Sequence, residues 1–384
     1  MTKDDADGPR ADAGALDADT DSDTTTALFD AISRGDVPAA MAALARGADI
    51  DARDQKASTP LMRVSEQTES LAMVETLLDA GADPRAQTQH GSTALTAAAR
   101  SNVDPRVVAV LLRAGCEVDT RDSQGHTPLW EAAANNPNPA VLEVLIEAGA
   151  DIEARGVAGT PLRGAAGFNH FPAPVRTLLA AGADVEARDS MGVSPLMHAA
   201  HEISSVAAWR EAHGGMDRLD ALLDAGADVD ARDAKGRTAI FHASAPETIL
   251  ALVEAGADVN VRDSGGRTAL AAADARVIPA LVAAGAEVDA RYRLGTTALM
   301  MRAAEAYDTD GIRALVACGA TIDARNDEGA TALMYAAVMN PRAEIVRALV
   351  DLGADPSLRD DDGLRAMSHA VLKMRSLEYM EPLR

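Results

Sequence analysis

The feature that most constrains this chain of 384 residues is a short segment that recurs along almost its whole length. In most copies it reads Gly-Ala, then Asp or Glu, an apolar residue, an acidic residue, Ala and Arg. The spacings between successive copies are 34, 34, 34, 33, 44, 30, 29, 34 and 34 residues. Such a period is typical of a repeat array, in which stacked units bury the apolar residues between neighbours. The copies begin at Gly47, Gly81, Gly115, Gly149, Gly182, Gly226, Gly256, Gly285, Gly319 and Gly353.

A second pattern follows about twelve residues after each glycine, as in Thr127-Pro128-Leu129. A hydroxyl residue is a preferred N-cap, and proline suits the first helical position because its missing N–H would have no partner there. We therefore expect a first helix to begin after each of these caps. They are Thr59, Thr93, Thr127, Thr160, Ser194, Thr238, Thr268, Thr297, Thr331 and, in altered form, Arg365.

Each repeat also predicts a second helix and a turn. Apolar residues from Val141 to Ala148 recur at spacings of three and four, and Gly149 can then end the helix in the left-handed conformation. Between helix pairs, segments such as Asp122-Ser123-Gln124-Gly125 place Asp or Asn first and Gly fourth, the preference of a type I turn. A repeat is therefore a turn, here called a finger, followed by two antiparallel helices.

Together these patterns resemble the ankyrin-repeat family, over roughly residues 26 to 384. The resemblance implies an all-α solenoid of about ten to eleven helix-pair units with short β-turn fingers. It also implies a concave groove and finger tips that bind proteins. One departure is that the family's usual histidine after Thr-Pro-Leu is methionine or another residue here, such as Met62 or Met334, which makes the contact between units more apolar.

The two ends of the chain depart from the repeat. Residues 1 to 25 carry eight aspartates and a single leucine, so we expect a disordered acidic tail, with an acidic docking segment as the alternative. Residues 26–46 predict a helix pair without a finger before it, which is an N-terminal cap. Residues 364–384 lose the repeat pattern and predict a C-terminal cap.

Three repeats break the length rule. The interval from Ser194 to Gly226 is ten residues too long, and the intervals from Thr238 and Thr268 to the next such glycine are four and five residues too short. The extra residues form an insertion at about 203–215 that includes Trp209. This change is either a tolerated loop variation, a segment that packs over the short repeats, or a loop that carries Trp209 to a partner.

Charge and composition exclude several classes of partner. The net charge is -23, which disfavours nucleic acid and anionic membranes and would attract a basic protein. No stretch approaches the roughly 20 apolar residues of a membrane span, and the N-terminus lacks a secretory signal, so we expect a cytoplasmic protein. Only four lysines stand against 32 arginines, which points to a GC-rich, bacterial genome.

Chemistry-bearing motifs are absent from the sequence. The sequence contains no recognisable Ser–His–Asp triad, phosphate-binding glycine loop or HExxH helix. We therefore expect no enzyme, no cofactor and no metal site, but a monomeric scaffold or inhibitor for a protein partner. In each repeat the fourth residue after the helix cap should face the groove. These positions predict partner-binding residues His198, His242, Met301 and Tyr335, to which the insertion adds Trp209.

A rival interpretation is a metal- or redox-linked accessory protein that uses His198, His201 and Cys116. His198 and His201 lie three residues apart on one predicted helix, but no further ligand stands at metal-binding spacing beside them. Cys116 and Cys318 lie six repeats apart, too far for a disulfide, so both should be reduced. Stoichiometric zinc or iron in the purified protein would favour this rival.

Overall fold

The computed structural model describes residues 15–67, 70–201, 216–373 and 380–383. Within these residues all regular structure is helical, and no β-strand is present. The chain divides into two compact parts. The N-terminal part is Met1–Asn169 with Ala180–Ala183, and the C-terminal part is His170–Leu179 with Asp184–Arg384.

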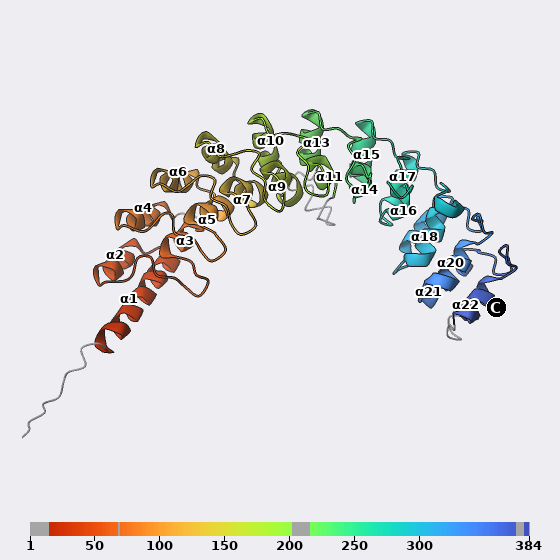
Figure 1. The fold of residues 1–384 in the computed structure, drawn as a ribbon, viewed down its shortest axis with the longest axis horizontal. Helices are drawn as coiled ribbons and strands as arrows, with labels where there is room; N and C mark the ends of the chain where they lie inside the picture. The colour runs from red at the N-terminus through yellow and green to blue at the C-terminus, as the bar shows by residue number, and fades with distance from the viewer. Residues whose placement is uncertain (1–14, 68–69, 202–215, 374–379, 384) are drawn as a thin grey trace, which may run out of the picture. The chain divides into compact units, whose positions relative to one another are not determined.

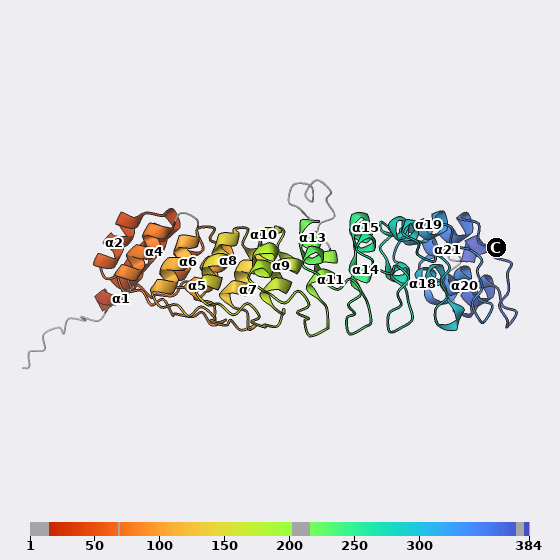
Figure 2. The same ribbon diagram turned by 90° about the horizontal axis from the view of Figure 1, so that it is seen from above.

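The N-terminal part is a stack of helix pairs (Figures 1 and 2). The first helices α3, α5, α7 and α9 contact one another in sequence, and so do the second helices α2, α4, α6 and α8. The elements are α1 (Ala15–Arg34), α2 (Val37–Ala45), α3 (Pro60–Ser65), α4 (Leu71–Asp79), α5 (Ala94–Ser101), α6 (Pro105–Arg113), α7 (Pro128–Asn135), α8 (Pro139–Glu147) and α9 (Pro161–Phe168).

The C-terminal part repeats this arrangement, with contacts from α11 through α14, α16, α18 and α20 to α22. Its second helices α15, α17, α19 and α21 form the other row. The elements are α10 (Ala173–Ala180, whose last residue belongs to the N-terminal part), α11 (Pro195–Ala200), α13 (Asp217–Asp224), α14 (Ala239–His242), α15 (Pro246–Glu254), α16 (Ala269–Ala272), α17 (Ile278–Ala283), η1 (Arg293–Gly295), α18 (Ala298–Glu305), α19 (Asp310–Ala317), α20 (Ala332–Met339), α21 (Ala343–Asp351), α22 (Ala366–Leu372) and η2 (Glu381–Leu383).

The helix signals in the sequence are confirmed. Every first helix that was expected begins directly after its cap, and the Thr127 hydroxyl accepts a hydrogen bond from the Trp130 N–H. The glycine after each second helix has a positive φ, for example 99° at Gly115, which only glycine adopts without strain. In the finger, the Gly125 N–H donates to the Asp122 carbonyl at 2.9 Å, which closes the four-residue turn.

Most repeats bury a leucine two residues after the cap. Leu61, Leu95, Leu129 and Leu196 are fully buried. Small alanines surround them in the first helices, for example Ala98 and Ala99 of α5, and let neighbouring pairs approach closely. Stability therefore comes from contacts between successive repeats, since one thin helix pair cannot cover its own apolar face.

α1 begins at Ala15 and so includes part of the segment predicted as a disordered tail, whose boundary at residue 25 stays a prediction. The helix that starts the array continues upstream of Leu28, and the Thr25 hydroxyl accepts a hydrogen bond from the Asp49 N–H at 3.4 Å. Through this hydrogen bond, the turn of α1 that contains Thr25 contacts the first finger. Amino-acid composition alone does not predict this contact. Residues 1–14 lie outside the described residues.

The short repeats differ from the others in their first helix. α14 and α16 each contain four residues, whereas α5, α7, α18 and α20 contain eight. The intervals in the sequence are four and five residues too short, about one helical turn, and the structure shows the shortening in the first helix. The insertion at about 203–215, including Trp209, lies outside the described residues.

Candidate protein-binding surface

The residues expected to face a partner are tied to the finger of their own repeat. Asp189, the first residue of a finger, accepts hydrogen bonds at Oδ1 from the N–H groups of Met191 and Val193, at 2.9 and 3.0 Å. Its other oxygen lies 3.1 Å from Nε2 of His198. Burial raises the pKa of Asp189, but its hydrogen bonds with Val193 and His198 outweigh this effect and hold the pKa below its ordinary value. His198 thus holds the finger against the helix that follows it.

The same tie, always between residues nine positions apart, recurs along the chain. The contact is an ion pair in some repeats and a neutral hydrogen bond in another. The two positions that meet are therefore the same, although the residue types differ. The pairs are Arg63 Nε with Asp54 Oδ2 at 3.3 Å, the Tyr335 hydroxyl with Asn326 Nδ2 at 3.1 Å, and His369 Nε2 with Asp360 Oδ2 at 2.7 Å. His242 Nε2 lies 3.4 Å from Asp233 Oδ2 in the same arrangement but forms no hydrogen bond.

These ties limit what the predicted residues offer to a partner. The side chains of His198 and His242 are 18% and 14% exposed, so each presents one edge of its ring. Met301 and Tyr335 are half-buried. The structure does not gather the four into one site, because each belongs to a different repeat. The sequence reasoning missed the tie, although Asp or Asn stands nine residues before most of these positions.

Tyr335 does contribute to a pocket of about 640 Å³. α20 supplies an apolar wall that includes Met334 and Met339, and the last two fingers supply carboxylates. Met339 is 60% exposed, which is unusual for so large an apolar side chain. The lining residues are Asp327, Glu328, Ala330, Met334, Tyr335, Val338, Met339, Asp360, Asp361, Asp362 and His369.

The pocket is strongly acidic. Five of the described residues that line it are Asp or Glu, and no lysine or arginine is among them. Burial raises the pKa of Asp360, but hydrogen bonds from His369 and the Leu364 N–H outweigh this and keep the pKa below its ordinary value, so Asp360 is an anion at neutral pH. The run Asp360-Asp361-Asp362 in the last finger was the sequence signal for this pocket, and the sequence reasoning did not use it.

A second cleft, of about 700 Å³, lies in the N-terminal part between α1 and the first finger. Phe29 lines it together with Arg53, Lys56 and Arg63, and with Asp30, Asp49 and Asp54. Positive and negative groups are therefore mixed here, and Arg63 already pairs with Asp54. The cleft lacks the single sign of charge that distinguishes the pocket beside α20.

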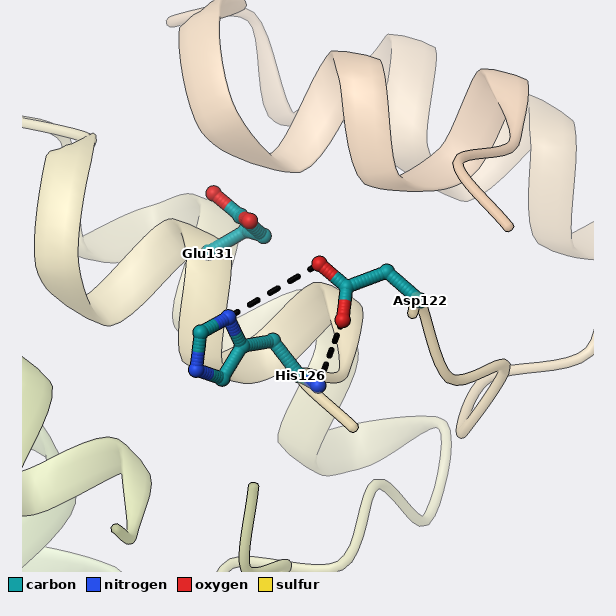
Figure 3. Close-up of side chains that lie close together, drawn as sticks. All are labelled: Asp122, His126 and Glu131. Carbon is teal, nitrogen blue, oxygen red and sulfur yellow. Dashed lines mark hydrogen bonds and ion pairs between the residues drawn. The ribbon is translucent and has the colours of Figure 1, made fainter. Parts of the chain in front are cut away.

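A compact cluster of Asp122, His126 and Glu131 lies in the N-terminal part (Figure 3). One possible ligand atom from each side chain lies within 4.8 Å of the others. The His126 ring stacks on Trp130, with ring centroids 3.7 Å apart, and burial lowers its pKa. The spacing of histidines in the sequence pointed to His198 and His201 as candidate ligands and not to this group.

The hydrogen bonds of the cluster favour a structural network over a metal centre. Nε2 of His126 accepts from the Ala158 N–H at 3.4 Å, so the ring proton belongs on Nδ1, which faces Asp122 Oδ2 at 3.7 Å. Arg100 holds both oxygens of Glu131, at 2.8 and 3.0 Å. A metal ion would have to displace the Nδ1 proton and compete with the guanidinium group for the same carboxylate.

The residues of the metal or redox rival are no better placed. His198 is paired with Asp189, as described above. The Cys116 thiol donates to the Pro84 carbonyl at 3.1 Å, and burial raises its pKa to about 12, which suppresses the reactive thiolate. Cys116 and Cys318 are both free thiols. Nothing in these contacts supports the rival function.

The fold and this surface define a class of protein: a tandem array of helix pairs with projecting fingers. The sequence profile of ankyrin repeats, in three copies, matches residues 61–156 and 268–360. The chain belongs to the ankyrin-repeat family. Comparison with curated proteins gives no significant match. None of the described helices is long and apolar enough to cross a membrane.

Proposed function

We propose that this ankyrin-repeat protein is a scaffold or inhibitor that binds a basic protein partner through its first helices and finger tips. The observation that carries the proposal is the acidic, partly apolar pocket beside α20, which holds Tyr335 and the exposed Met339. Tyrosine and methionine are enriched in the cores of protein interfaces. Ankyrin repeats in general are protein–protein interaction modules.

Electrostatics support a basic partner. The net charge of -23 raises the rate of encounter with a positively charged surface, and the acidic fingers direct it to the pocket. We further propose that the chain acts as a monomer in the cytoplasm, without catalysis. The side chains of His198 and His242 are only 18% and 14% exposed, so we assign them a smaller share of the binding energy than Tyr335, which lines the pocket.

The test begins with the proteins that co-purify with the tagged chain from its native host. Affinity for a purified candidate is then measured for Tyr335→Ala, Met301→Ala and Arg63→Ala. We expect Tyr335→Ala and Met301→Ala each to weaken binding by more than about 1 kcal/mol, and Arg63→Ala to have less effect. Added salt should weaken binding further, because it screens exposed charges beyond about 8–10 Å. A partner that binds equally well to all three variants would contradict the proposed surface.

A further inference from the structure

We propose that the pocket formed by α20, α22 and the last two fingers binds an arginine side chain of the partner. This inference rests on the proposed function and specifies the chemistry that the pocket recognises. A volume of about 640 Å³ falls within the range of specific binding sites. The pocket combines an apolar wall, an aromatic ring and free carboxylates, which are the three surfaces that a long planar cation can use together.

The apolar wall suits the aliphatic stem of arginine. Met334, Val338 and Met339 line the pocket from successive turns of α20. Long cationic side chains lay their methylene groups along such surfaces while the charged head stays in a polar region. Covering Met339 would also remove from water one of the largest exposed apolar side chains among the described residues.

The aromatic ring of Tyr335 suits the guanidinium head. The Tyr335 hydroxyl is held by Asn326, so the ring has a fixed orientation in the pocket. A guanidinium group is planar and stacks on aromatic faces, which ammonium does less well. The chain uses this contact itself, since Arg342 lies 5.2 Å from the centre of the Tyr307 ring and Arg262 lies 5.7 Å from that of Tyr292.

The carboxylates divide into two groups. Asp360 is already used, because its oxygens accept from the Leu364 N–H and pair with His369. Asp361 and Asp362 also line the pocket and form no ion pair with any of the described residues. Two unpaired carboxylates beside an aromatic ring can accept the forked N–H groups of arginine.

The cleft near α1 offers a contrast within the same chain. It has a similar volume, but Arg53, Lys56 and Arg63 supply its own positive charges. An incoming arginine would be repelled there and find Asp54 already occupied by Arg63. Charge complementarity therefore assigns the arginine to the pocket beside α20.

A display library of random short peptides, selected on the full-length chain, tests the inference without knowledge of the natural partner. We expect arginine to be enriched at one position of the binders. The affinity of a selected peptide is then measured by fluorescence anisotropy. The double variant Asp361→Asn/Asp362→Asn should weaken binding at least about tenfold. The matched control Glu305→Gln/Glu344→Gln removes two exposed charges that do not line the pocket and should leave affinity within about twofold.

Changes in the peptide separate charge from shape. Citrulline in place of arginine keeps the size and planarity but removes the charge, and it should abolish most of the binding. Lysine keeps the charge but loses the fork and the stacking, so it should bind more weakly than arginine. Tyr335→Phe should retain most of the affinity and Tyr335→Ala should not. Thermal melts of the variants verify that each remains folded.

The outcomes separate this inference from the proposed function. Selected peptides without enriched arginine, or arginine peptides whose affinity the Asp361/Asp362 variant leaves unchanged, would overturn the arginine pocket and leave protein binding intact. Failure to select any peptide, together with no partner whose affinity depends on Tyr335, would overturn both.

Discussion

At the scale of single residues, arginine joins several fingers to the next. Nη1 of Arg121 donates to the Gly125 carbonyl of its own finger at 3.1 Å and to the Arg155 carbonyl of the next repeat at 2.8 Å. Arg232 and Arg262 repeat this geometry. A single guanidinium nitrogen, with two N–H groups in fixed directions, therefore donates to the carbonyls of both fingers. The excess of arginine over lysine, which the sequence suggested was a matter of genome composition, therefore has a structural cause as well.

This bridging predicts that Arg121→Lys destabilises the protein by about 1 kcal/mol, the net value of a lost hydrogen bond. A flexible ammonium group cannot hold both carbonyls in the same directions. Chemical denaturation measures the change. Arg113→Lys, at the exposed end of α6, is the control and should change stability by less than about 0.5 kcal/mol. Equal losses of stability in the two variants would show that Arg121 does not stabilise the protein by bridging the two fingers.

His242 gives a pH-dependent prediction. Burial lowers its pKa from 6.5 to about 4, with Arg237 adding to the effect and Asp233 opposing it. Arg237 occupies Asp233 Oδ2 at 2.7 Å, which leaves His242 the longer contact of 3.4 Å. His198 also disfavours a charge on the ring. Between about pH 4 and pH 6.5, His242 therefore carries a proton in the unfolded chain but not in the folded chain.

The stability that neutral His242 contributes is therefore complete above about pH 6.5 and is lost as the pH falls toward 4. The whole loss corresponds to about 3 kcal/mol. We expect His242→Gln to lose less stability than the wild type over this range when unfolding is measured at successive pH values. Parallel pH curves for the two proteins would show that His242 titrates normally.

The caps and glycines at this scale could be predicted from the sequence because each acts on its immediate neighbours. Thr127 caps α7 and Gly115 ends α6 wherever the rest of the chain lies. The tie between His198 and Asp189 could not be derived in this way. It depends on how a finger folds back over the next helix, which places two residues nine positions apart in contact.

At the scale of helices, a buried asparagine joins successive pairs. Asn136, which ends α7, is fully buried, and its Nδ2 donates to the carbonyls of Ala99 and Asn102 in the preceding repeat, each at 2.9 Å. Its Oδ1 accepts from the Asn138 N–H, which shapes the turn to α8. Asn102, Asn169 and Asn340 donate in the same way.

The asparagine contact is interrupted where repeat lengths change. The residues that end α11, α14 and α16 are His201, Ala243 and Ala273. The repeats of abnormal length therefore lack this asparagine contact, as does α18, whose repeat has the normal length and which ends at Ala306. The asparagine role itself was not predicted, because its partners are carbonyl groups 34 and 37 residues away.

We expect Asn136→Ala to destabilise the protein by about 2–4 kcal/mol, since it leaves two buried carbonyls without a donor. The neighbouring Asn135 is exposed and donates only within α7, to Glu131. Asn135→Ala is therefore a control one residue away that should cost less than about 1 kcal/mol. Urea unfolding of the two variants gives the comparison. A small effect at Asn136 would mean that water or a backbone shift satisfies the carbonyls.

At the scale of the whole molecule, the sequence predicted a repeat array because its period is visible in the residues themselves. The pocket beside α20 was not predictable, since it depends on which side chains of two successive repeats face each other. Tyr335 was singled out for its chemistry, but its neighbours Asp361 and Asp362 belong to the next finger. Contacts between repeats thus carry both the stability and the candidate function.

Because those contacts recur at a fixed spacing, removing one complete repeat should leave the others in register. Deletion of Gly319 to Leu352 joins Cys318 to Gly353, which stands at the same position 34 residues later. The hydrogen bonds between repeats that the deletion removes can be replaced by equivalent ones. Asp289 accepts from the Thr321 N–H in the intact chain and can accept from Asp355 after the deletion. Arg291, which donates to the Arg325 carbonyl, can likewise donate to that of Arg359.

We therefore expect this deletion to give a folded protein with a slightly lower melting temperature and nearly unchanged helical circular dichroism per residue. The same protein should lose peptide binding, because α20 and Tyr335 are removed with the repeat. Deleting α20 alone (Ala332–Met339) is the control that breaks the register, and it should unfold the end of the array. Complete loss of helical signal in the whole-repeat deletion would indicate one cooperative core, in which distant repeats depend on each other directly.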